Sequence, residues 1–226
     1  MAPSGSARLP AAHRLFALPL LLACAGAFCL SACATGASGN GNGGGSASAR
    51  PTAGGTPSAA PAAQTRAMRS LVSLAAQRVM TADTVAAAKW GTNQPIDDPA
   101  REKAVMDGVL AQAAKASMNQ DIVRRIFEGQ MTANKTVQQA LYSRWTASPA
   151  LRPTHRPDLA TQVRPVLDRI DAQLLDAIGQ AEPLLSGDPR CKAILDQDVA
   201  ATAATMRLDA VHLAGVKQSL AAACRP

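Results

Sequence analysis

The chain has 226 residues, a formal net charge of +7 and only 3% aromatic residues. Its lysines and arginines are interleaved with acidic residues, and few aromatic side chains are available for stacking on bases, so we expect no nucleic-acid partner. A basic balance of this kind favours a small anionic ligand.

The first 33 residues have the organisation of a secretory signal peptide. Residues 1–14 are basic and free of acidic side chains, and residues 15–30 form an apolar run that is too short and too rich in small residues for a membrane span. The run ends in Leu30-Ser31-Ala32-Cys33, which resembles the lipobox of bacterial lipoproteins and would make Cys33 the lipidated residue. An ordinary cleavage site, Ala32-Cys33-Ala34, would instead release a soluble protein. Both interpretations predict export to the periplasm or beyond.

A flexible linker is expected between the signal peptide and the folded domain. Residues 34–66 contain eight glycines with serine, alanine, threonine and proline, and almost no large apolar side chain. Such a segment buries too little apolar surface to offset the entropy of ordering it. From residue 67 onward only six glycines occur, and helix-forming residues dominate. We therefore expect one folded domain over residues 67–226.

The cysteines predict one disulfide. Three of the five lie within the first 33 residues, which leaves Cys191 and Cys224 in the domain. An exported domain with two cysteines is expected to pair them, with a stabilisation of about 3–4 kcal/mol in the chain-entropy model. The three histidines are scattered and no cysteine has metal-ligand spacing, so no metal site is expected.

The domain is predicted to be an all-α bundle of about six helices, because no alternating strand pattern of useful length occurs. Asp98-Pro99 and Asn119 are expected to begin the second and third helices. The expected helices cover residues 66–90, 99–117, 119–145 and 158–185, followed by a pair that starts after Asp188-Pro189. Pro165 is expected to kink or delay the fourth helix. The inward-facing residues expected on that helix are Val163, Val166, Ile170, Leu174, Ile178 and Leu185.

Helical spacing brings several polar side chains onto common faces. Arg78 and Lys89 are eleven residues apart, which returns to within about 20° of one face and separates their backbones by about 16 Å. Long side chains from both positions could reach one small anion. Asn134 and Gln138 form an i, i+4 pair of amides. On spacing alone, a solvated surface position is the more common role for each of these residues.

The same residues carry a family resemblance. The segments Ala76-Gln77-Arg78-Val79, Ala87-Ala88-Lys89-Trp90 and Pro95-Ile96-Asp97-Asp98-Pro99-Ala100-Arg101-Glu102, followed by Asn134 and Gln138, resemble the helical (type II) chorismate mutases, and more narrowly their secreted, gamma subclass. The core of the resemblance covers residues 68–146. The subclass resemblance extends through Arg164 to Cys191 and Cys224, which that subclass pairs.

The resemblance implies a cofactor-free conversion of chorismate to prephenate in a homodimer with a whole site in each chain. By position, Arg78 and Arg164 match the arginines that bind the two substrate carboxylates. Lys89 and Gln138 match the partners of the ether oxygen. The remaining residues implied at the site are Glu102 at the ring hydroxyl, Asp98 and Arg101 beside it, and Asn134 as a hydrogen-bond donor to a substrate carboxylate.

This chain departs from the family at two of these positions. Asn134 stands where serine or threonine is usual, and some secreted members carry glutamate in place of Gln138. In a basic pocket, loss of Arg78 or Lys89 is expected to lower activity with little loss of stability. Two alternatives remain open, an isochorismate pyruvate lyase on the same scaffold and a non-catalytic helical module that binds an anion or a protein partner.

Overall fold

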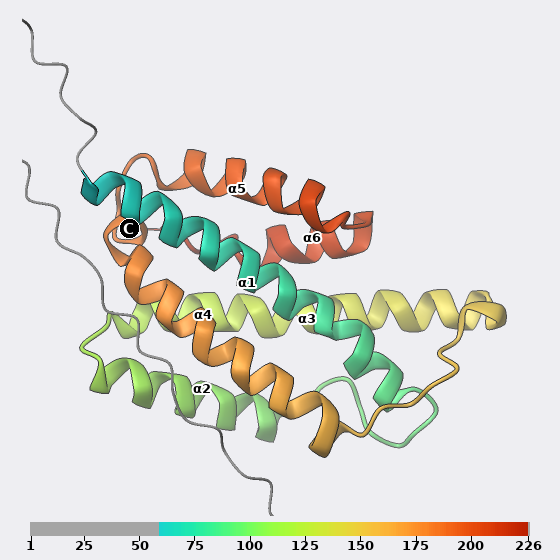
Figure 1. The fold of residues 1–226 in the computed structure, drawn as a ribbon. Coiled ribbons are helices and arrows are strands. Elements are labelled where there is room, and N and C mark those ends of the chain that lie inside the picture. Colours follow the sequence, from blue (N-terminus) through green and yellow to red (C-terminus); the bar gives the residue numbers. More distant parts are fainter. Residues whose placement is uncertain (1–58, 226) are drawn as a thin grey trace, which may run out of the picture. The chain divides into compact units, whose positions relative to one another are not determined.

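The structure, a computed structural model, describes residues 59–225 and contains six α-helices and no strand within that range (Figure 1). The helices are α1 (Ala59–Lys89), α2 (Pro99–Lys115), α3 (Gln120–Ala147), α4 (Arg164–Leu185), α5 (Cys191–Met206) and α6 (Ala210–Ser219). The all-α prediction is confirmed. The predicted signal peptide with Cys33 and most of the predicted linker lie outside the described residues. None of the helices between residues 59 and 225 is long and apolar enough to span a membrane.

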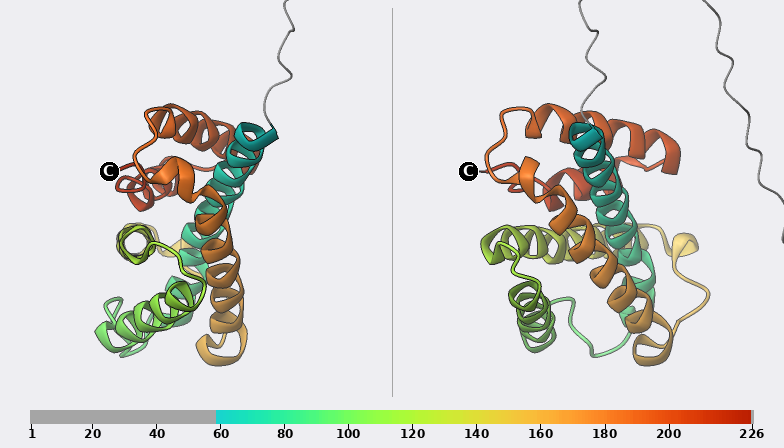
Figure 2. Two further views of the ribbon diagram at one scale, coloured as in Figure 1. Left: turned by 90° about the vertical axis from the view of Figure 1, so that its left-hand side faces the viewer. Right: turned by 60° about the vertical axis from the view of Figure 1, so that its left-hand side comes forward.

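The long helix α1 is the centre of the bundle. It packs most extensively against α4 and α3, and less extensively against α5 and α6. Figure 2 shows α5 and α6 at the end of the α1–α4 pair that holds the start of α1, with α2 toward the other end. Helix α1 begins at Ala59 and not at Arg66 as expected, because small helix-forming residues extend it outward. Its first buried side chain is Ala67, so the core still starts where the composition changes.

The starts of α2 and α3 agree with the predicted capping residues. The Asp98 carboxylate accepts a hydrogen bond from the backbone N–H of Arg101 at 3.1 Å, and Pro99 is the first helical residue. The Asn119 side-chain oxygen accepts from the N–H groups of Asp121 and Ile122. Each cap satisfies backbone donors that have no partner within the helix. Asp98 thereby fixes where the first turn of α2 begins.

The start of α4 differs from the prediction in its detail. A single π-helical turn, Leu159–Val163, precedes the α-helix, with Asp158 accepting from the N–H of Thr161 at 2.7 Å. Proline at position 165 lacks an N–H and is therefore tolerated in the first turn. The expectation for Val166 was wrong, since it is 42% exposed. Leu167 takes the inward position and packs with the cluster that contains Val163.

A disulfide joins the start of α5 to the segment after α6, and a buried histidine ties α6 to α1. Cys191 and Cys224 form the predicted disulfide, with their Cα atoms 5.7 Å apart. The buried His212 on α6 contacts Asp83 of α1 at 3.1 Å and Asp209 at 2.7 Å. The hydrogen bond with Asp83, reinforced by Asp209 and opposed by burial, raises the pKa of His212 to about 9. This imidazole is therefore charged at neutral pH and ties α6 to α1.

An aromatic cluster fixes the end of α1 against the end of α3. Trp90 makes edge-on contacts with Tyr142 and Trp145, at centroid distances of 4.8 and 5.3 Å. The guanidinium of Arg156 donates to the Trp90 carbonyl at 2.8 Å. The chain that leaves α1 is consequently held in place directly after Lys89.

Candidate active site

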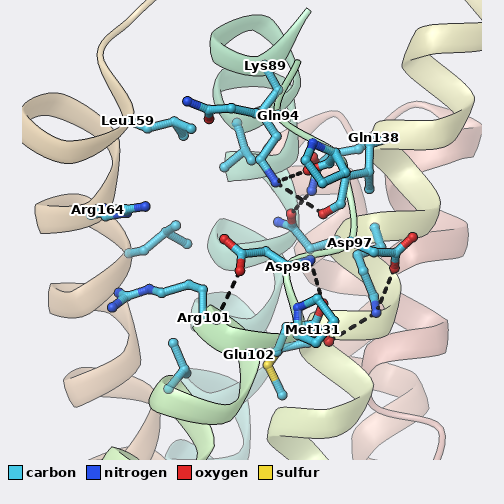
Figure 3. A pocket seen from close by; sticks show the side chains of 18 of the residues that line it. Lys89, Gln94, Asp97, Asp98, Arg101, Glu102, Met131, Gln138, Leu159 and Arg164 are labelled. Carbon is cyan, nitrogen blue, oxygen red and sulfur yellow. Dashed lines mark hydrogen bonds and ion pairs between the residues drawn. The ribbon is translucent and has the colours of Figure 1, made fainter. Parts of the chain in front are cut away.

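A cavity of about 470 Å³ lies between α1, α2, α3, the start of α4 and the connection between α1 and α2 (Figure 3). All eight residues that the sequence predicted for a substrate site line it: Arg78, Lys89, Asp98, Arg101, Glu102, Asn134, Gln138 and Arg164. They come from four helices and from the N-cap of α2, so the bundle assembles the site from segments as far as 86 residues apart (78 to 164). Residues 186–225 contribute none of the lining.

Arg78 reaches the cavity from the middle of α1. The residue is 5% exposed, and its Nε donates to Oδ1 of Asp171 on α4 at 2.5 Å. The guanidinium carbon also lies 5.9 Å from the centre of the Phe127 ring. The sequence predicted Arg78 as a cation of a basic pocket whose loss costs little stability, and the structure adds a buried carboxylate partner to it.

Lys89 lies in the last turn of α1 and is 8% exposed. Its ammonium group donates to the carbonyls of Pro95 and Ile96 at 2.9 and 3.1 Å, as the dashed lines in Figure 3 show. Burial lowers the pKa of Lys89, and the nearby carboxylates, foremost Asp98, partly offset the shift. Neutral carbonyl partners leave the positive charge uncompensated by direct pairing, which suits a group that must bind an anion.

Hydrogen bonds fix the orientation of the two side-chain amides on α3, those of Asn134 and Gln138. Asn134 Nδ2 donates to the backbone carbonyl of Arg78 at 3.1 Å and to Thr81 Oγ1 at 3.3 Å. A carbonyl only accepts, so the Asn134 nitrogen must face it, and the Asn134 oxygen must then face Gln138. Gln138 Nε2 donates to that oxygen at 2.8 Å and keeps one further N–H. Gln138 Oε1 is buried without a hydrogen-bond partner among the described residues.

The first turn of α2 and its neighbours form the rim of the cavity. Arg101 pairs with Asp168 of α4 at 2.8 Å. Glu102 accepts from Lys135 of α3 at 3.0 Å, and Lys135 also contacts Asp97 at 3.1 Å. The hydrogen bond with Glu102 is the main cause that raises the pKa of Lys135. Two of the predicted binding residues, Arg101 and Glu102, are therefore already engaged in ion pairs at the rim.

Arg164 is the first residue of α4, and its side chain is directed from that helix toward the cavity (Figure 3). The preceding π-helical turn sets its position. No hydrogen bond joins its guanidinium to another residue of the described chain, so it can bind an anion without breaking a contact.

The lining residues that the sequence did not predict as site residues include two charged ones on α3 and α4, Lys135 and Asp171. Asp171 follows Arg164 by seven residues, which places both on one face of α4, and Lys135 precedes Gln138 by three on α3. That spacing could have indicated them, but it does not reveal their partners.

Chemically, the cavity offers positive charge and amide N–H donors for an anion. Within residues 59–225, no group of three or more histidine, cysteine, aspartate or glutamate side chains is arranged to hold a metal ion. The donor set suits catalysis by positioning and charge stabilisation.

Comparison with known proteins gives the family. The sequence model described as chorismate mutase type II matches residues 69–139. A secreted chorismate mutase of Mycolicibacterium smegmatis is 32% identical over 69% of this chain and 84% of its own length, and one of Mycobacterium tuberculosis is 31% identical over 66% and 73%. A crystal structure of chorismate mutase from Burkholderia thailandensis, 34% identical, superposes with a TM-score of 0.67 over 70% of this chain and 99% of its own. The chain belongs to the chorismate mutase family, in its type II, all-helical branch.

Proposed function

We propose that the chain catalyses the rearrangement of chorismate to prephenate in this cavity. One observation carries the proposal: Lys89 and Gln138 line the same cavity as Arg78 and Arg164. Two hydrogen-bond donors for the ether oxygen of the substrate therefore lie beside two cations for its carboxylates. Family membership supports the same activity, which makes the enzyme an intramolecular transferase.

The reaction explains why these side chains are sufficient. Chorismate is a dianion, and its rearrangement is unimolecular, so it needs no nucleophile and no proton transfer. Arg78 and Arg164 bind the carboxylates and hold the enolpyruvyl arm over the ring in the reactive conformation. The ether oxygen gains negative charge as its bond to the ring breaks. Lys89 and the remaining N–H of Gln138 then bind the transition state more strongly than the substrate.

The other lining residues have supporting roles. Glu102 accepts from the ring hydroxyl while Lys135 holds its carboxylate in place. Asp98 starts α2, and Arg101 adds positive charge at the mouth of the cavity. Asn134 has both its N–H groups engaged in the free protein. Its contribution therefore runs chiefly through the orientation of Gln138.

Incubation of the purified protein with chorismate, and separately with isochorismate, followed by quantification of prephenate and pyruvate, tests the proposal. We expect loss of chorismate with equal gain of prephenate. Lys89→Met should lower kcat/KM at least about a hundredfold, the scale of losing one preorganised donor. Lys103→Met on the exposed face of α2 is the matched control and should have no effect. Release of pyruvate from isochorismate would favour the lyase, and no turnover of either compound would favour a binding module.

We also propose export, on the basis of the signal-peptide pattern in residues 1–33, with a linker from residue 34 that ends where α1 begins at Ala59. The relatives named secreted chorismate mutases support export. The lipobox pattern favours anchoring through Cys33, and the subclass resemblance favours a homodimer. Cys33→Ala should move the protein from the membrane fraction to the soluble exported fraction. A wild-type protein that is already soluble and carries no lipid would contradict the anchor.

A further inference from the structure

Asp171 is a carboxylate in a cavity that we assign to a dianion. It lies on α4, its side chain is 9% exposed, and it lines the cavity beside Arg78. A negative charge at this place opposes the binding of an anion. It also lowers the positive charge that Arg78 offers. Its presence therefore requires a compensating advantage.

The advantage lies in how Arg78 is held. Asp171 Oδ1 accepts from Nε at 2.5 Å, the Phe127 ring lies 5.9 Å from the guanidinium carbon, and Asn134 holds the backbone carbonyl of the same residue. A guanidinium has two edges that can bind a carboxylate with two parallel N–H groups. One edge includes Nε, which Asp171 occupies. The edge formed by Nη1 and Nη2 makes no hydrogen bond with any residue of the described chain.

We propose that Asp171 is a positioning residue that fixes the guanidinium plane of Arg78 and presents its Nη1–Nη2 edge to a substrate carboxylate. The inference rests on the proposed function and extends it. Without Asp171, the guanidinium can rotate and can offer either edge. The substrate must then fix the plane itself, at a cost in conformational entropy that lowers the rate.

The two roles of the carboxylate, as acceptor and as charge, can be separated by substitution. Asp171→Ala removes both and should lower kcat/KM at least about tenfold, mainly through kcat. Asp171→Asn keeps an acceptor oxygen for Nε but removes the charge. It should restore most of the lost kcat and also lower KM, because the repulsion of the dianion is gone. Asp176→Ala, at an exposed position on the same helix, is the control.

A double-mutant cycle tests whether Asp171 acts through Arg78. If it does, Asp171→Ala should have no further effect on kcat in an Arg78→Ala protein. A further loss in that background would mean that Asp171 contacts the substrate itself. A purely structural carboxylate predicts a lower Tm for Asp171→Ala and Asp171→Asn with unchanged kcat/KM below the midpoint. Either of these results would overturn the inference.

A measurement on the wild-type protein needs neither a variant nor turnover. The Nε–H of Arg78 should give a resolved NMR signal that exchanges with water at least tenfold more slowly than that of the exposed Arg124. Rapid exchange would overturn the inference even if the enzyme is active. If the signal is protected but the protein does not convert chorismate, the geometry inferred for Arg78 stands and only the proposed function is refuted.

Discussion

The hydrogen bond from Gln138 Nε2 to the side-chain oxygen of Asn134 leads to a specific prediction for the variant Gln138→Glu. In the wild type, one N–H of Gln138 binds the oxygen of Asn134 and the other is free for the ether oxygen. An ionised carboxylate would instead face two oxygens as an acceptor only. Because the position is 3% exposed and the oxygen of Asn134 cannot donate, both burial and the missing donor should raise the pKa of the introduced carboxyl group.

The loss of stability follows from the difference in bound protons between the folded and the unfolded state. A raised pKa of the folded state destabilises the variant, and the loss grows by about 1.4 kcal/mol per pH unit from about pH 4.3 up to the new pKa. Activity should fall over the same range, while the wild type stays nearly flat between pH 5 and 8. Loss of the donor should cost about 100-fold or more in kcat at pH 8. The protonated variant has only one O–H for two acceptors, so its rate at acid pH should remain below the wild-type rate.

The assay is the rate of chorismate loss between pH 5 and 8, with urea unfolding at the same pH values. The variant Asn134→Ser, combined with Gln138→Glu, supplies a hydroxyl that can donate to the carboxyl group. It should recover part of the rate at acid pH. A Gln138→Glu protein that equals the wild type at pH 8, with the same flat profile, would show that Gln138 does not face the reacting oxygen.

Three further predictions concern stability. Arg78→Ala should destabilise the fold by about 3–5 kcal/mol, because Asp171 is left buried without its partner. Urea unfolding measures this loss, and an unchanged midpoint would mean that the pair is open to water. The raised pKa of His212 adds stability that is complete below pH 6.5 and lost as the pH rises through 9. The loss should be on the order of 1–2 kcal/mol after solvent screening, and His212→Gln should abolish this pH dependence. Reduction of the Cys191–Cys224 disulfide should cost about 3–4 kcal/mol without changing kcat at 25 °C, and a large fall in kcat would contradict a site confined to α1–α4.

Most of the fold could be predicted from the sequence, because local signals determine it. Asp98 and Asn119 mark helix starts through their own side chains, and two cysteines in an exported domain leave one pairing. The start of α1 was less predictable, since small helix-forming residues extend a helix without any packing. Val166 and Leu167 both fit a 3.6-residue period, and only the packing against α1 selects Leu167.

The membership of the site was predictable, but its electrostatics was not. Spacing and resemblance identified Arg78, Lys89 and Gln138 as lining residues. They could not reveal that Asp171, on another helix, pairs with Arg78, because that contact depends on how α1 and α4 cross. The expectation that loss of Arg78 costs little stability did not take this ion pair into account. The cavity contains carboxylates that position its cations.

The most direct test of the account is a crystal structure with a bicyclic dicarboxylate ether that mimics the transition state. We predict the ether oxygen within about 3 Å of both Lys89 Nζ and Gln138 Nε2, and one carboxylate bound end-on by Nη1 and Nη2 of Arg78. The second carboxylate should contact Arg164. An ether oxygen that faces neither Lys89 nor Gln138, or a ligand bound outside this cavity, would contradict the central claim.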